Sequence, residues 1–273
     1  MSWHDGPLVM FDVETTGVDP HRDRIVTAAV ISHEPGRDVI VHEWLLDPGI
    51  EIPASAAAIH GITGDIARAT GRPAPEVTQA ASTLISLCEN GSPVVGHNVS
   101  FDLTMLWAEC IRHGRPDLAD ELPELRVIDT MVLDKWADPW RPKAATTRRP
   151  EPPTAKAPRT RKHGSRRLVD TCAVYGIPLS VADAHGAVAD ALAAGRLAWR
   201  LAREFPGLTG TARELHEFQI GEKRAQAESF AEWLLKQGKP SEAAGVSRDW
   251  PIVPMPHGWT PDQLPTHTEA VPA

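Results

Sequence analysis

The first 50 residues alternate between apolar runs and turn-forming residues in a way that predicts three β-strands. An apolar run opens at Leu8 and continues through Val13, which is typical of a buried strand. Residues 24–31 and 39–46 predict two more strands, and Pro35-Gly36 supplies the turn between them. The chain therefore begins as a run of strands joined by short turns.

Farther along, helical and strand patterns alternate. The spacing predicts helices over residues 78–88, 101–113, 167–175, 186–204 and 211–237, with short strands over 93–95 and 126–128. The helix over 186–204 carries Ala187, Ala191, Ala194 and Ala198 on one face, a stripe of small residues suited to close packing on a sheet. Strands followed by alternating helices and strands predict an α/β fold, with a mixed five-stranded sheet flanked by helices.

The pattern breaks between residues 138 and 164. Six prolines and almost no large aliphatic residues leave too little apolar surface for a core, so we interpret this segment as a disordered insertion. Residues 141–167 hold ten Lys or Arg and a single acid, Glu151, in a chain of net charge −8. Such a segment either contacts phosphates or is a solvated spacer or docking segment. We therefore expect one domain from residues 1–137 and 165–205, interrupted by 138–164 and followed by a helical extension and tail over 206–273.

Composition narrows the cellular setting. No basic stretch followed by an apolar run marks a secretion signal near Met1, and no segment approaches the length of a membrane span. Three cysteines are an odd number without a CxxC pair, which indicates free thiols in a reducing compartment. The sequence predicts a cytoplasmic protein with no membrane partner.

Four carboxylates and one histidine stand where local structure would bring them together. Asp12 and Glu14 are two residues apart on the first strand, so both point to the same face. Two acids on an apolar strand are costly unless a cation neutralises them. Asp102 falls in the first turn of a helix after a short strand, and Asp190 lies early in the small-residue helix. His185 is five residues before Asp190, which places it in the loop before that helix.

This set of residues predicts a metal site. Carboxylate oxygens without thiolates favour Mg²⁺ or Mn²⁺ and leave room for phosphate oxygens. Two such ions can clamp the attacking and leaving oxygens of a phosphodiester, with a neutral imidazole at His185 as the base for the attacking water.

The blocks FDVETTG, GHNVSFD and HGAVAD, in this order, resemble the three motifs of the DEDDh (DnaQ-like) exonucleases. That family includes the proofreading subunit of bacterial DNA polymerase III, RNase T and oligoribonuclease. The resemblance covers residues 8–204 and implies an RNase H-like fold and 3′→5′ exonuclease activity. It implies Asp12, Glu14, Asp102 and Asp190 as the ligands of two metal ions, with His185 as the fifth catalytic residue. Position 186 is Gly, which excludes the sister group that uses a tyrosine.

The resemblance also implies contacts to the 3′-terminal nucleotide. Thr15 and Thr16 either touch that nucleotide or cap the strand end through their hydroxyls. His60 and Asn98 are candidates for phosphate or sugar contacts and Phe101 for base stacking, whereas we interpret Asp129 as structural. The motifs do not separate DNA from RNA ends as substrate. A DNA polymerase or another replication or repair protein is a candidate partner. The alternative is an inactive nucleic-acid-binding module, which predicts damage to one of the five catalytic positions, and none is damaged.

Overall fold

The architecture comes from a computed structural model that describes residues 2–139, 141, 164–180 and 185–254. Most of the insertion (residue 140 and residues 142–163) and the tail from residue 255 lie outside the described residues, so the disorder expected there remains a prediction.

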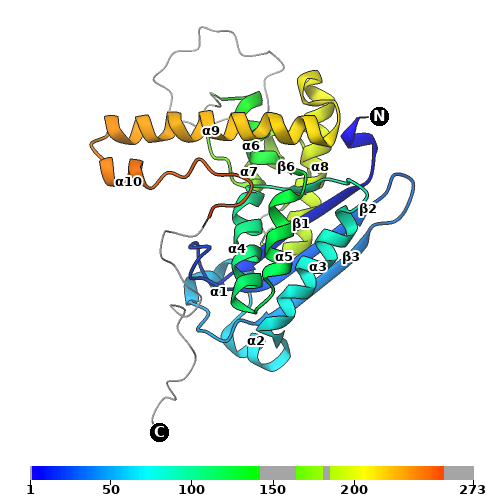
Figure 1. Ribbon diagram of the computed structural model, residues 1–273, viewed down its shortest axis with the longest axis vertical. Coiled ribbons are helices and arrows are strands. Elements are labelled where there is room, and N and C mark those ends of the chain that lie inside the picture. The colour runs from blue at the N-terminus through cyan, green and yellow to red at the C-terminus, as the bar shows by residue number, and fades with distance from the viewer. Residues whose placement is uncertain (1, 140, 142–163, 181–184, 255–273) are drawn as a thin grey trace.

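A mixed sheet forms the centre of the molecule (Figure 1). Its strands are β1 (Leu8–Thr15), β2 (Ile25–His33), β3 (Ile40–Asp47), β4 (Arg72–Pro73), β5 (Val94–Gly96) and β6 (Val127–Asp129), in the spatial order β4-β3-β2-β1-β5-β6. β1, β2 and β3 form an antiparallel meander, whereas β5 runs parallel to β1, β6 parallel to β5, and β4 parallel to β3. The α/β class is confirmed. The sheet has six strands where five were expected, because Arg72-Pro73, too short to show a strand pattern, pairs with Leu46 and Asp47.

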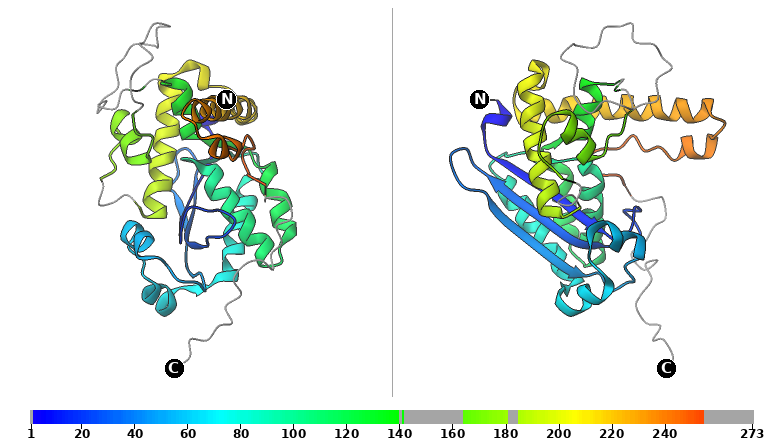
Figure 2. Two further views of the ribbon diagram at one scale, coloured as in Figure 1. Left: turned by 90° about the vertical axis from the view of Figure 1, so that its left-hand side faces the viewer. Right: turned by 180° about the vertical axis from the view of Figure 1, so that it is seen from behind.

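Helices cover both faces of the sheet (Figures 1 and 2). They are α1 (Ala54–His60), α2 (Gly64–Thr70), α3 (Val77–Cys88), α4 (Val99–Arg112), α5 (Pro116–Glu121), α6 (Thr130–Ala137), α7 (Leu168–Val174), α8 (Ala187–Glu204), α9 (Ala212–Lys236) and α10 (Pro240–Ala244). α3 and α4 pack on one face and α8 on the other, which gives two apolar layers. Among the described residues, no helix combines the length and the apolar composition that crossing a bilayer requires.

The segment after residue 206 packs against this sheet. Gln219 of α9 accepts a hydrogen bond from the Asp129 amide at 2.7 Å and donates one to the Val127 carbonyl at 2.9 Å. His216 accepts from the Val127 amide at 3.0 Å. These side chains satisfy the outer edge of β6, which would otherwise present unpaired backbone groups. Farther on, Trp250 is buried in the same core cluster as α3 and α4.

Candidate active site

Asp12 and Glu14 lie on the face of β1 that α8 covers. Leu8 and Met10 of this strand belong to the core cluster that includes α8 residues, whereas Phe11 belongs to the cluster on the opposite face. Since side chains alternate along a strand, Asp12 and Glu14 follow Leu8 and Met10 onto the α8 face. The period of the strand thus places both acids on one face, as the sequence predicted, and the structure shows that α8 covers this face.

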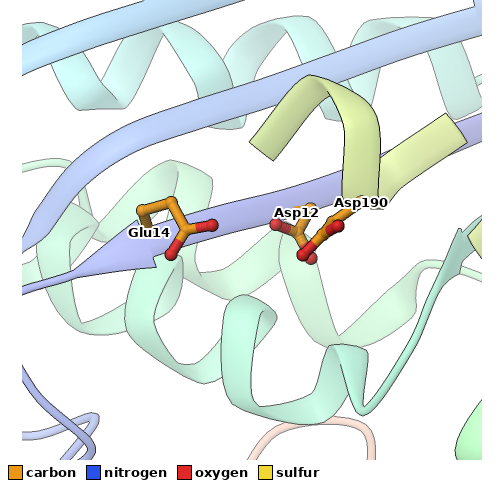
Figure 3. A group of neighbouring side chains, drawn as sticks. All are labelled: Asp12, Glu14 and Asp190. Atoms are coloured by element: carbon orange, nitrogen blue, oxygen red, sulfur yellow. The ribbon is translucent and has the colours of Figure 1, made fainter. Parts of the chain in front are cut away.

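α8 brings a third acid to this pair. Asp12, Glu14 and Asp190 each offer a carboxylate oxygen within 4.8 Å of the others (Figure 3). The close approach depends on small residues of α8: a Cβ added at Gly195 would lie only 2.3 Å from the Met10 sulfur. Asp190 Oδ1 is buried and accepts no hydrogen bond from the residues that the structure describes, although it lies in a group of acids. A cation that binds all three oxygens would relieve this arrangement.

Asp102 joins the group from the first turn of α4. Its side chain is buried, and its Oδ1 accepts a hydrogen bond at 3.1 Å from the amide of Val13, the residue between Asp12 and Glu14. Its charge raises the pKa of Asp12, so the two carboxyls are neighbours. Asp102 has no oxygen within the 4.8 Å group. Three of the four predicted acids therefore converge directly, and the fourth is anchored to the backbone between two of them.

The carboxyls of this cluster are hard to ionise, because they are buried and lie close to one another. Burial, and then the charges of Asp102, Asp190 and Glu14, raise the pKa of Asp12 well above its ordinary value. Burial and the Asp190 charge raise the pKa of Glu14 to about 7, and burial raises the pKa of Asp102 to about 8. Crowded carboxyls resist ionisation because each charge repels the next. A divalent ion would remove that repulsion.

His185 immediately precedes the helix that carries Asp190. Its backbone is left-handed (φ 74°), and Gly186 forms the N-cap of α8. The His185 amide donates a hydrogen bond to Asp190 Oδ2 at 3.3 Å. The histidine thus lies outside the helix, in the loop position that the spacing predicted, while residues 181–184 before it lie outside the described residues. Its catalytic role remains a prediction.

The hydroxyls of Thr15 and Thr16 are both used within the protein. Thr15 donates to the Gly17 carbonyl at 2.6 Å. Thr16 is buried, donates to Asp23 Oδ1 at 3.0 Å and accepts from the Arg24 amide at 3.0 Å. These bonds favour the capping alternative for both hydroxyls.

His60 lies at the C-terminal end of α1, next to the same strand end. Burial lowers the pKa of His60 and a hydrogen bond involving the Thr15 backbone opposes that shift, so the ring lies beside Thr15. Residues separated by 45 positions are thereby brought to one place, as a shared nucleotide pocket requires.

Asn98 is the N-cap of α4 and, like His185, has a left-handed backbone (φ 63°). Its amide donates to Asp129 Oδ1 at 2.9 Å, and the same oxygen accepts from the Met131 amide at the start of α6. Asp129 is fully buried and joins two helix starts, which agrees with its structural interpretation. Phe101, in the first turn of α4, is half-buried against the core cluster that includes residues of α3 and α4.

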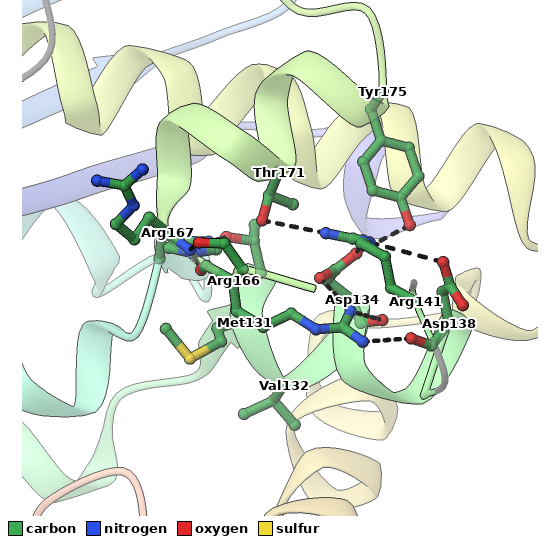
Figure 4. A network of polar contacts seen from close by, with 12 residues as sticks. Met131, Val132, Asp134, Asp138, Arg141, Arg166, Arg167, Thr171 and Tyr175 are labelled. Atoms are coloured by element: carbon green, nitrogen blue, oxygen red, sulfur yellow. Dashed lines mark hydrogen bonds and ion pairs between the residues drawn. The ribbon is translucent and has the colours of Figure 1, made fainter. Parts of the chain in front are cut away.

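The sequence did not predict two networks of buried ion pairs that the structure shows. One centres on Glu109 of α4, which is bound by Arg24 and Arg112. The other centres on Asp134 of α6, which is bound by Arg141 and Arg166 and accepts from the Tyr175 hydroxyl (Figure 4). A usable indication for the first was an acid seven residues after Asp102 on an otherwise apolar helix face. The second was hidden because both arginines belong to the compositionally unusual segment.

Most of the chain is similar to known proteins. Residues 9–198 match the exonuclease family of RNase T type. A DNA polymerase III subunit epsilon-like protein of Rhodobacter capsulatus is 39% identical over 102 residues, 36% of this chain and 14% of that protein. The PolC-type DNA polymerase III of Pediococcus pentosaceus is 26% identical over 49% of this chain and 9% of its own length. The chain thus corresponds to a small part of these relatives.

Solved structures show the same fold. Exonuclease I of Methylocaldum szegediense superposes with a TM-score of 0.56 at 25% identity over 80% of this chain and 43% of that chain. The E. coli exonuclease I complex with a dT13 oligonucleotide gives 0.56 at 24% identity over 74% and 42%. The family match spans β1 through most of α8, including all five residues that the motifs singled out. The resemblance of the three motifs is therefore confirmed, and the chain belongs to the exonuclease family.

Proposed function

We propose that this protein is a metal-dependent 3′→5′ exonuclease that hydrolyses the terminal phosphodiester bond of single-stranded DNA and releases nucleoside 5′-monophosphates. The observation that carries the proposal is the convergence of Asp12, Glu14 and Asp190 oxygens within 4.8 Å, beside Asp102, in a chain of the exonuclease family. Carboxylates that raise one another's pKa, on elements of a nuclease fold, fit a catalytic site better than a structural one.

The donor set fits Mg²⁺ or Mn²⁺. Among the described residues it consists of carboxylate oxygens alone, and Asp190 Oδ1 is buried there without a hydrogen-bond partner. Asp12, Glu14 and Asp190 would hold the ions together with Asp102, and we propose two ions per site. Bound ions would stabilise the negative charge on the attacking and leaving oxygens of the phosphodiester.

Side chains of the protein would carry out proton transfer and bind the substrate. His185 lies in the loop directly before the Asp190 helix, and its imidazole would accept the proton of the attacking water. Thr15 and His60 lie together at the end of β1, where the terminal nucleoside would bind. Asn98 and Phe101, at the start of α4, would add contacts to the adjoining sugar, phosphate or base.

DNA is favoured over RNA by the names of the relatives. Relatives that match part of the chain include a PolC-type DNA polymerase III and a DNA polymerase III subunit epsilon-like protein, and the E. coli exonuclease I structure contains dT13. A replication or repair polymerase is the partner class that these names suggest. Three unpaired, buried cysteines fit the reducing cytoplasm in which we place the protein.

A timed digest of 5′-labelled DNA and RNA oligonucleotides of matched sequence, with Mg²⁺ or Mn²⁺, tests the proposal. We expect a ladder that shortens from the 3′ end, runs faster on DNA, stops with chelator and resumes with added metal. Asp12→Asn and Asp190→Asn should abolish it, while the exposed-strand variant Glu43→Gln should not. A faster RNA digest would reassign the substrate. No digestion of either strand by folded protein would favour the inactive binding module.

A further inference from the structure

The β1–β2 loop, residues 16–24, leaves β1 two residues after Glu14. It is tied together internally: Asp23 accepts from the Thr16 hydroxyl at 3.0 Å and from the Asp19 amide at 2.8 Å. The Asp23 carboxylate fills the space beside Gly17, where an added Cβ would lie 2.4 Å from it. At the tip, Val18 is 89% exposed. The loop therefore has a defined shape and presents an apolar side chain to solvent.

This shape is held from outside by α4. Arg112 donates to the Asp23 carbonyl at 3.0 Å and to the His21 carbonyl at 2.6 Å. Arg24, the last residue of the loop, donates through Nε and Nη2 to the two oxygens of Glu109 at 2.7 and 3.0 Å. Two guanidinium groups thus hold the loop: Arg112 binds its backbone carbonyls, and Arg24 links its last residue to α4.

Glu109 holds both guanidinium groups. Its Oε1 also accepts from Arg112 at 3.1 Å, and His113 lies 3.1 Å from its Oε2. Its side chain is 2% exposed and that of Arg112 is also 2% exposed. Removing one partner from a buried charge network leaves the others uncompensated, so the network acts as a unit. The loop's position therefore depends on one carboxylate.

Glu109 and Asp102 are seven residues apart on α4, which brings both to the same face of the helix. Asp102 contacts β1 at Val13, and two turns later Glu109 contacts the loop that follows β1. The Asp102 contact is a separate hydrogen bond to a β-strand. The metal carboxylates are thus mounted on β1, α4 and α8, whereas the loop shape is set through Glu109.

We propose that Glu109 is a positioning residue for substrate: through Arg24 and Arg112 it fixes the β1–β2 loop in the form that binds the terminal nucleoside. The inference rests on the proposed function and adds a requirement to it. Loss of the Glu109 charge raises KM for substrates that carry a nucleoside, without impairing the carboxylate cluster.

Two small esters separate these effects. The 4-nitrophenyl ester of thymidine 5′-monophosphate carries a nucleoside, whereas bis(4-nitrophenyl) phosphate carries none. For Glu109→Gln we expect KM for the thymidine ester to rise about tenfold, the scale of one lost charged hydrogen bond, with kcat within about twofold. Hydrolysis of bis(4-nitrophenyl) phosphate should stay within about twofold of wild type. Arg112→Leu, which removes the two bonds to loop carbonyls, should reproduce the pattern, and Arg112→Lys should restore part of it.

The control is Asp134→Asn, which disrupts an equally buried carboxylate that binds two arginines but not this loop. It should change both esters alike or neither. All assays are run well below each variant's melting temperature.

Equal losses on both esters in Glu109→Gln, or no change on either, would overturn the positioning role. If the wild type cleaves the thymidine ester alone, a fall in kcat without a rise in KM would overturn it. A wild-type protein that hydrolyses neither ester nor an oligonucleotide would instead refute the proposed function.

Discussion

Glu14→Gln should stabilise the metal-free protein at alkaline pH and leave its stability unchanged in acid. Burial and the Asp190 charge raise the pKa of Glu14 from 4.5 to about 7 in the folded state. A carboxyl whose folded pKa is raised binds its proton more tightly when folded, so stability is lost as pH rises from 4.5 through 7. Glutamine has the shape of the protonated acid and carries no such dependence.

The magnitude follows from the shift. At 1.36 kcal/mol per pKa unit, ionising Glu14 in the fold costs about 3 kcal/mol by pH 8. For a chain of this size, that corresponds to a rise of about 6–12 °C in the Tm of Glu14→Gln over wild type, without metal. The value is an upper bound because neighbouring carboxyls share the repulsion.

The assay is thermal unfolding in chelator at pH 4.5 and 8, then at pH 8 with saturating Mg²⁺ or Mn²⁺. In metal the difference should shrink to a small fraction of its size, because wild type gains about 2.7 kcal/mol at a hundredfold excess over Kd and the variant gains less. Glu43→Gln, an exposed acid on β3, is the matched control and should show neither effect. If the Tm of Glu14→Gln is below that of wild type at both pH values, or differs from it by the same amount at both, the raised pKa of Glu14 is contradicted.

Three further outcomes are expected. Burial alone would raise the pKa of Glu109, but hydrogen bonds from His113 and Arg24 lower it to about 2. The ionised carboxylate therefore contributes about 3 kcal/mol to the free energy of unfolding above pH 4.5, and this contribution is lost toward pH 2. In urea denaturation, the free energy of unfolding of Glu109→Gln should therefore fall less steeply than that of wild type between pH 4.5 and 2. His185→Ala should lose about two to four decades in cleavage rate, yet bind Mn²⁺ as tightly as wild type in an equilibrium titration. Gly195→Ala should destabilise the fold by about 1–3 kcal/mol, and a double-mutant cycle with Met10→Ala should show strong coupling, because the new Cβ meets the Met10 sulfur; additive effects would deny that contact.

The long strands and helices could be predicted from the sequence, because their apolar residues recur with the period of a strand or of a helix. Alternation along β1 was enough to put Asp12 and Glu14 on one face, and the Ala stripe of α8 was enough to orient Asp190. Short helices were missed. α1 and α2 have seven residues each, too few for a clear period, and α6 starts at Thr130 directly after β6 without a turn residue between them.

Contacts between distant segments could not be predicted. Arg24 and Glu109 are 85 positions apart, and nothing near either residue indicates the other. The same holds for Gln219, which reaches β6 across 90 residues to bond the Asp129 amide. Periodicity fixes which way a side chain faces, but the identity of its partner depends on how the layers are stacked.

A comparison among the protein's own buried acids explains why function is assigned to one cluster. Glu109 is surrounded by Arg24, Arg112 and His113, and Asp134 by Arg141 and Arg166. Each of these carboxylates is neutralised by the fold. The group formed by Asp12, Glu14 and Asp190 instead meets other acids: burial raises the pKa of all three, and the charges of neighbouring carboxylates raise the pKa of Asp12 and Glu14 further. Among the described residues, two arginines neutralise each of the other two buried acids and none is paired with the three-acid cluster, whose charge a cation from solution would balance.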